Sequence, residues 1–402
     1  MPSKRFLRNA VTLGLLSAIG PFAIDMYLPA LPAIGGDLHA DNSSVQLSLT
    51  VFFIAVSLCQ SIYGPLSDMV GRKRPLYIGL ALFSIGSIGC ALAPSIGTLI
   101  VFRFLQGIGA CAGMVIPRAV VRDLHTGVDA TRLMSLLMLV FSISPILAPL
   151  TGSFVIQLGG WRAVFWVVLV AAVIGWAILG TLQETRPPAD RADSNLRSAI
   201  AAYGLLLRDR HFLGLAAIGA FGISSFFVYL SNSPFVLIEH YHLSPRLYSL
   251  CFSINAASFF AVAQLNGWLA MRFGLKRVVR TAVVAFAAVM LVLLALFAAG
   301  VDRLDVMAVL LFVGFGALGM VIPTTAVLAL EEHGAIAGTA SALMGTIQFV
   351  VGAVVMLIVG SFLNGTALPM VAGIAGCATL ALLFAQVTLR AETLAEPATE
   401  YK

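Results

Sequence analysis

The segment GPLSDMVGRKR at residues 64–74 has a counterpart, GWLAMRFGLKR, at residues 267–277. The two copies share a glycine at their first and eighth positions and a Lys-Arg pair at their end. A second pair lies further along: GIGA followed by GMVIP in residues 107–117, and GFGA followed by GMVIP in residues 314–323. Similar motifs about 200 residues apart indicate two parallel repeats of one structural unit.

The composition is that of a membrane protein. Of the 402 residues, 60% are hydrophobic and 10% are charged, whereas soluble domains carry about 25% charged residues. A water-soluble multidomain enzyme is therefore excluded. The formal net charge is +6, but the basic residues lie at the ends of apolar segments and form no stripe with aromatic side chains. Nucleic acid is therefore not an expected partner.

Twelve apolar segments are long enough to cross a bilayer core, which takes about 20 residues per helix. They cover 7–30, 46–66, 76–94, 97–118, 132–157, 162–182, 212–237, 247–271, 278–300, 305–330, 336–362 and 367–389. We expect an all-α membrane protein with twelve transmembrane helices in two six-helix halves. The expected parts are an N-terminal bundle at 1–182, a cytoplasmic linker at 183–211, a C-terminal bundle at 212–389 and a cytoplasmic tail at 390–402.

The basic residues set the expected orientation. With the N-terminus in the cytoplasm, 20 of the 24 Lys and Arg residues fall on the cytoplasmic side. Three (Arg162, Arg246 and Arg303) fall outside, and Arg103 lies within a helix. Cytoplasmic loops of membrane proteins carry the excess of Lys and Arg. We therefore expect a multi-pass protein of the bacterial inner membrane with both termini on the cytoplasmic side.

The motifs resemble those of the major facilitator superfamily over nearly the whole chain. GPLSDMVGRKR (64–74) resembles its helix 2–3 signature, RFLQGIGA (103–110) the helix 4 signature of proton-coupled members, and SPILAPLTG (144–152) the helix 5 signature of the drug:proton antiporters. Four further segments resemble the Bcr/CflA branch, whose members export bicyclomycin, chloramphenicol-type drugs and sulfonamides. They are IDMYLPALP (24–32), RAVVRD (118–123), QETRPP (183–188) and GTASALMGTIQF (338–349).

The resemblance implies a monomeric, proton-coupled exporter of small drugs that works by alternating access. Its energy source would be the proton gradient, with no cofactor. An exporter or importer of a metabolite such as a nucleoside or purine is the alternative within transport. A membrane-embedded enzyme is the alternative of another class, and it is disfavoured because P-loop, HExxH and GxSxG motifs are absent from the sequence. The duplicated halves favour a carrier over a channel.

Asp25 and Arg103 are two ionisable groups inside predicted helices. A charge in the hydrocarbon requires a partner, a wet cavity or a function. In the superfamily fold the first and fourth helices line one cavity, and we expect these residues at similar depth. We therefore expect Asp25 to carry the exchanged proton and Arg103 to tune the pKa of Asp25. A static ion pair that orders the N-terminal half is the alternative.

A gating role is expected for residues near the cytoplasmic ends of helices and on the fifth helix. The resemblance makes Asp68 part of a charge cluster with Arg72 and Asp123, while glycines would allow tight turns and close backbone approach. Prolines would kink the fifth helix. The candidate gating residues are Gly64, Asp68, Gly71, Arg72, Asp123, Pro145, Pro149 and Gly152.

Candidate substrate-binding residues combine aromatic rings with uncharged polar groups, which suits small amphipathic compounds. They are Phe22, Tyr27, Ser225, Phe226, Tyr229, Asn232, Asn255 and Gln348. Interhelical hydrogen bonding is the alternative role for each. The five cysteines all lie in apolar segments without CxxC spacing, so we expect no disulfide and no metal site.

The orientation can be tested with reporter fusions. Fusions at Lys402 and within Arg186–Arg197 should report a cytoplasmic location, because the basic residues hold these segments inside. A periplasmic signal from either fusion would overturn this topology.

Overall fold

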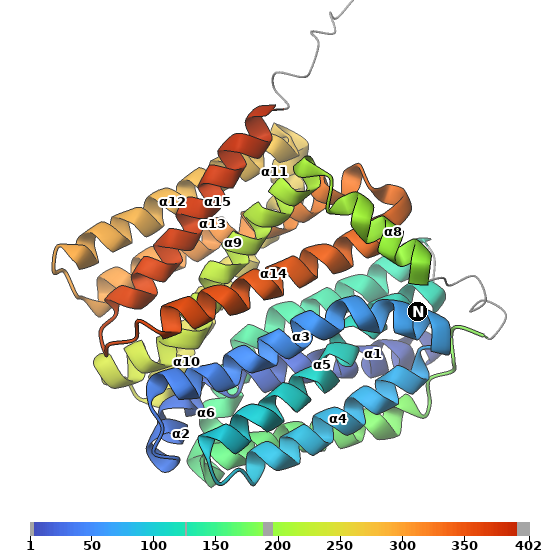
Figure 1. Cartoon of the computed structure of the whole chain (residues 1–402), viewed down its shortest axis with the longest axis horizontal. Helices are drawn as coiled ribbons and strands as arrows, with labels where there is room; N and C mark the ends of the chain where they lie inside the picture. Colours follow the sequence, from blue (N-terminus) through green and yellow to red (C-terminus); the bar gives the residue numbers. More distant parts are fainter. Residues whose placement is uncertain (1–3, 125–126, 188–195, 392–402) are drawn as a thin grey trace, which may run out of the picture. The chain divides into compact units, whose positions relative to one another are not determined.

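The computed structural model describes residues 4–124, 127–187 and 196–391, and most of these residues are helical (Figure 1). The elements up to residue 206 are α1 (Lys4–Asp25), η1 (Leu28–Ala30), α2 (Leu31–Asp37), α3 (Asn42–Val70), α4 (Lys73–Ala91), α5 (Ile96–Leu124), α6 (Gly127–Leu179) and α8 (Leu196–Leu206). The later elements are α9 (Arg210–Pro234), η2 (Phe235–His240), α10 (Pro245–Ala263), α11 (Asn266–Phe273), α12 (Leu275–Ala298), α13 (Leu304–Glu331), η3 (Gly334–Ile336), α14 (Ala337–Gly360) and α15 (Leu368–Ala391).

The number of membrane-spanning helices follows from the length of α6. Eleven segments of the described residues are long and apolar enough to cross a membrane, and one of them covers 48 residues. At about 1.5 Å per residue such a helix is far longer than the bilayer core. Its backbone leaves the helical conformation at Gly159 and Gly160, so it makes two crossings. The predicted all-α fold with twelve spanning helices is confirmed.

The first spanning segment differs from the prediction of one helix over 7–30. α1 ends at Asp25, a 3₁₀ turn follows at Leu28–Ala30, and α2 continues to Asp37. Proline has no backbone N–H and clashes with the carbonyl four residues before it. Pro29 therefore cannot bond the Asp25 carbonyl, and the helix breaks there. Asp25 lies at a helix end rather than inside a helix.

Two further segments are less regular than predicted. The predicted helix 212–237 ends as α9 at Pro234 and continues as a π-helix, η2; π-helical turns are rare in proteins. The predicted helix 247–271 is divided into α10 and α11 by a break at Gln264 and Leu265. In the predicted linker, residues Leu196–Leu206 form the short helix α8.

The chain divides into two compact units. The first comprises residues 1–199 together with Pro234–Ser253, and the second comprises Ile200–Ser233 together with Ile254–Lys402. This division differs from the predicted bundles at residues 234–253, because that segment bonds to the first unit. Asn42 donates to Glu239 over 2.7 Å, and Ser249 donates to the Pro149 carbonyl over 2.9 Å.

The repeated glycine motifs have a packing role in both units. In the first unit α5 packs against α1, α3 and α4, and α1 packs against α6. A Cβ atom at Gly107, Gly109 or Gly113 would collide with the backbone of the neighbouring helix. In the second unit a Cβ atom at Gly319 of α13 would collide with the Phe259 carbonyl of α10. Small residues at these contacts let the helix backbones approach, which helix association in lipid requires.

Two glycines on α5 provide a matched test of this packing. Gly109→Ala should lower the free energy of unfolding of the purified protein by about 1–3 kcal/mol, and with it the melting temperature, because the added methyl group meets the backbone at Phe83 and Gly79. Gly97→Ala should be neutral or slightly stabilising, because no atom lies within 4 Å of the added methyl group. Equal melting temperatures for the two variants would contradict the packing role.

Candidate functional site

Asp25 is a buried carboxylate at the break between α1 and η1. Its exposed fraction is 4%, and the hydroxyl of Ser144 on α6 lies beside it. α6 approaches this turn closely because residue 152 is glycine; a Cβ atom there would collide with the Met26 carbonyl oxygen. Within the described chain Asp25 has no cationic partner, so its charged form would be costly.

Arg103 is fully buried on α5. Its Nη1 donates to the Ala23 carbonyl over 3.2 Å and to Oε1 of Gln106 over 2.6 Å. The guanidinium lies 4.5 Å from the ring centres of both Tyr27 and Phe52, distances at which cation–π attraction is appreciable. Nε and Nη2 have no hydrogen-bond partner among the described residues.

The structure does not join Asp25 and Arg103 in an ion pair. Nη1 is used by Ala23 and Gln106, and the other two nitrogens of Arg103 have no partner among the described residues. The static ion pair, which was the alternative to a coupling role, is absent from this conformation. Arg103 nevertheless reaches α1 at Ala23, two residues before Asp25. The result is a carboxylate and a guanidinium in neighbouring parts of one unit, each without a counter-ion.

The aromatic candidates of the first unit differ in their surroundings. The Tyr27 hydroxyl is hydrogen-bonded to the Ser48 hydroxyl over 2.7 Å, and its ring packs 5.5 Å from that of Phe165. Phe22 is half-buried. The prediction missed Phe52 and Phe165, which surround Arg103, because apolar residues of a spanning helix give no sequence signal for a special role.

The second unit contains an aromatic cluster with one polar pair. Asn255 donates to the Tyr229 hydroxyl over 2.9 Å. The Tyr229 ring lies 5.2 Å from that of Phe315, and Phe226 lies 5.5 Å from the same ring. The structure thus brings together three of the predicted substrate residues on α9 and α10, and it adds Phe315 of α13.

The other predicted polar residues of this unit do not join that pair. Ser225 donates to the Gly222 carbonyl of its own helix. Asn232 donates to the Val228 carbonyl over 2.8 Å, while its Oδ1 has no hydrogen-bond partner among the described residues. Gln348 is half-buried, and its amide nitrogen lies beside Gly219. The Oδ1 atom of Asn232 is therefore an unused hydrogen-bond acceptor in the second unit, as far as the described residues show.

The predicted gating charges form one cluster in the first unit. Arg72 is 3% exposed; its Nε lies 2.8 Å from Asp123 and its Nη1 lies 2.6 Å from Asp68. Burial alone would lower the pKa of Arg72, but the bonds to Asp123 and Asp68 outweigh burial and raise that pKa above its usual value. Arg72 is therefore a permanently charged, fully paired group.

Two residues of this cluster were missed as site residues. Glu184 accepts hydrogen bonds from the backbone N–H groups of Arg72 and Lys73 over 2.8 and 3.2 Å. Arg186 donates to the Asp68 carbonyl over 3.0 Å. Both residues lie in the QETRPP segment, which resembles the Bcr/CflA branch. That resemblance could have singled them out, but nothing in the segment's own sequence predicts these contacts.

The two gating glycines differ. Gly71 has a φ of 94°, a conformation that favours glycine and makes the tight turn expected between α3 and α4. At Gly64 a Cβ atom would meet nothing within 4 Å. The expected close approach at Gly64 is therefore absent from this structure.

Pro145 and Pro149 lie within α6, which continues helically through both. The carbonyls next to them accept hydrogen bonds from α10: Ser253 donates to Ile146 over 2.6 Å, and Ser249 donates to Pro149 over 2.9 Å. Both serines are buried. These two bonds hold the start of α10 on the proline-containing part of α6.

Sequence comparison identifies a family. Residues 13–356 match the family described as Major Facilitator Superfamily. The chain is 37% identical to an uncharacterized MFS-type transporter, YdgK, of Bacillus subtilis, over 91% of this chain and 92% of the relative. It is 28% identical to a bicyclomycin resistance protein homolog of Haemophilus influenzae, over 93% and 94%. It is 33% identical to the multidrug resistance protein MdtL of Escherichia coli, over 58% and 59%.

Solved structures agree on the fold. A D-xylose–proton symporter superposes with a TM-score of 0.72 at 18% identity, over 94% of this chain and 96% of the symporter. A mutant form of the nucleoside transporter NupG superposes with a TM-score of 0.69 at 17% identity, over 95% of this chain and 99% of NupG. At these identities the likeness concerns the fold alone.

The two buried arginines should respond to the same substitution to different extents. Arg72→Met should lower the free energy of unfolding by about 1–3 kcal/mol, because Asp123 and the partly exposed Asp68 lose their shared cationic partner. Arg103→Met should cost much less or stabilise, because an apolar side chain replaces a buried charge without a counter-ion. Thermal unfolding in detergent measures both, with the exposed Arg303→Met as control. A larger loss at Arg103 than at Arg72 would contradict the assignment.

Proposed function

We propose that this chain, which belongs to the major facilitator superfamily, exports small amphipathic drugs across the bacterial inner membrane in exchange for protons. Membership, the twelve spanning helices and the absence of enzyme motifs make it a transporter rather than an enzyme. The observation that carries the proposal of proton coupling is the buried, unpaired carboxylate of Asp25 at a helix break.

A carboxyl group without a counter-ion is more stable neutral than ionised when it is shielded from water. It therefore binds a proton when shielded and releases it when water or a cation reaches it. A turn between helices can change its backbone conformation more easily than a helix interior can. Asp25 has such a turn directly after it, which supports its assignment as the group that carries the exchanged proton.

Arg103 is the group that we assign to promote proton release. Two of its nitrogens are free to donate, and its contact with Ala23 places it against the same helix as Asp25. A shift of α1 that exchanged the Ala23 carbonyl for the Asp25 carboxylate would stabilise the ionised form. The rings of Tyr27 and Phe52 keep the guanidinium positioned while it is without a counter-ion.

The substrate class follows from neutral polar groups set among aromatic rings. Tyr229, Asn255 and the open acceptor of Asn232 offer hydrogen bonds, and Phe226 and Phe315 offer apolar surface. Sites of this kind suit small neutral or weakly basic molecules. The name of the bicyclomycin resistance relative supports a bicyclomycin-like substrate, and that of the multidrug resistance relative supports more than one drug. Phenicol- and sulfonamide-like substrates are proposed from the motif resemblance.

The Arg72 cluster is proposed to keep the cytoplasmic ends of α3, α4 and α5 together during transport. Its members come from all three helices and from the segment after α6. A unit held at these ends can move as one body between conformations, as alternating access requires.

The function is tested in proteoliposomes made with the purified chain. An imposed pH gradient should drive accumulation of labelled phenicols, bicyclomycin or sulfonamides, and a nucleoside panel tests the metabolite alternative. Equal uptake with and without the gradient would contradict proton coupling, and nucleoside uptake alone would replace the drug assignment.

Asp25→Asn should abolish uphill accumulation driven by the pH gradient while downhill exchange persists, because the amide keeps the shape of the carboxyl group but carries no proton. Substrate binding should then release no protons, measured by calorimetry in buffers of different ionisation enthalpy. Asp305→Asn, which changes an exposed carboxylate paired with Arg303, is the control. Proton release by Asp25→Asn equal to that of the parent would move the coupling site elsewhere.

A further inference from the structure

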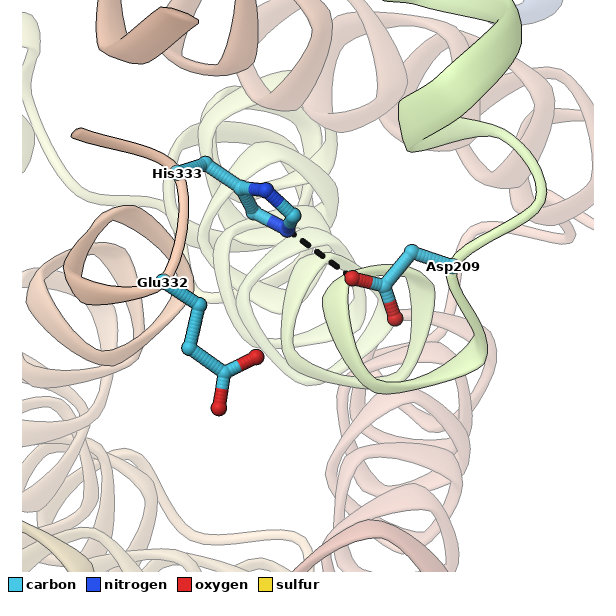
Figure 2. A group of neighbouring side chains, drawn as sticks. All are labelled: Asp209, Glu332 and His333. Carbon is cyan, nitrogen blue, oxygen red and sulfur yellow. Dashed lines mark hydrogen bonds and ion pairs between the residues drawn. The ribbon is translucent and has the colours of Figure 1, made fainter. Parts of the chain in front are cut away.

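Three metal-ligating side chains converge in the second unit, and none of them is among the residues assigned to transport. Asp209 lies directly before α9, and Glu332 and His333 follow α13 (Figure 2). One ligand atom from each residue lies within 4.8 Å of the other two. No motif spacing reveals this group, because Asp209 and His333 are 124 positions apart.

Two of the three side chains are held in place. Oδ1 of Asp209 accepts the backbone N–H groups of His211 and Phe212 over 2.8 and 3.2 Å, as a helix cap does. Its Oδ2 lies 2.9 Å from Nε2 of His333. The His333 ring packs edge-on against Phe212 with 5.4 Å between ring centres. These contacts orient the carboxylate and the imidazole toward one another.

A helix cap bonded to a histidine accounts for Asp209 and His333 but not for Glu332. In the described part of the chain the Glu332 carboxylate has no hydrogen bond or ion pair, and one of its oxygens lies within 4.8 Å of the ligand atoms of the other two side chains. Figure 2 shows it beside the bonded pair but not joined to it. Three protein ligands with water in the fourth position form a coordination that Zn²⁺ takes, and Glu332 would supply the third ligand.

We propose that Asp209, Glu332 and His333 bind a divalent transition-metal ion of the Zn²⁺ type, with water completing the coordination. One imidazole and two carboxylates match the ligands that Zn²⁺ takes at about 2.0–2.2 Å. Such bonds set the ligand atoms about 3.3–3.5 Å apart, so the observed spacing requires only side-chain movement. Mg²⁺ is disfavoured, since it prefers octahedral oxygen ligands.

The ion would tie the beginning of α9 to the end of α13. These helices carry Tyr229 and Phe315 of the aromatic cluster, so the ion would stabilise the scaffold of that cluster. Binding to the folded state alone raises the melting temperature with ion concentration. The inference does not depend on the proposed transport function.

The experiment uses the full chain without a polyhistidine tag, treated with chelator and then dialysed against Zn²⁺ or Co²⁺. We expect one ion bound per chain and a melting temperature that rises with Zn²⁺ but not with Mg²⁺. With Co²⁺ we expect the visible absorption spectrum of an ion with a low coordination number. His333→Gln, Asp209→Asn and Glu332→Gln should each weaken binding at least tenfold. Asparagine also caps helices, so Asp209→Asn keeps the start of α9.

The control is His242→Asn, which removes an exposed histidine outside the cluster and should bind like the parent. Melting temperatures measured in chelator show whether each variant is folded. A parent that retains no ion after dialysis, or a His333→Gln variant that binds as tightly as the parent, would reduce the cluster to a hydrogen-bonded helix cap.

Discussion

The lack of water in the bilayer core is the constraint on which this structure depends. Each backbone N–H and C=O group there must be bonded within the protein, so the chain crosses as helices. Helices in lipid gain little from the hydrophobic effect and associate through close packing instead. The glycines of α5 and α13 supply that closeness, because the neighbouring backbone occupies the space of a Cβ atom at Gly109 and at Gly319.

The same constraint gives the prolines their importance. A proline leaves a carbonyl unbonded, and the chain must find it another partner or break the helix. At Pro29 the helix breaks and leaves Asp25 beside a turn. In α6 the helix continues through Pro145 and Pro149, whose missing N–H groups deprive the Phe141 and Pro145 carbonyls of their usual helical bond. The serines of α10 bond two other carbonyls of the same stretch, those of Ile146 and Pro149. Proline therefore ends one helix, before Pro29, and is accommodated inside another, α6.

The buried charges divide into two chemical kinds. Arg72 is bonded by two carboxylates and a hydroxyl, so its charge is compensated and serves structure. Arg103 and Asp25 are uncompensated, and the rings around Arg103 offset only part of the cost of burying it. A protein that keeps two uncompensated charges of opposite sign in one unit without pairing them retains the means to pair them in another conformation.

The sequence by itself determined the helical class, the twelve crossings and the repeat, which follow from hydropathy and from motif spacing. The cluster of Arg72 with Asp68 and Asp123 was expected from the family resemblance, because Asp123 is 51 positions from Arg72 and no local spacing brings them together. Only the tertiary structure decided that Asp25 and Arg103 are unpaired, that Phe315 joins Tyr229, and that Asp209 meets His333. The reason is physical: those contacts depend on helix rotation and on where helices break, and neither is encoded in the spacing of any single segment.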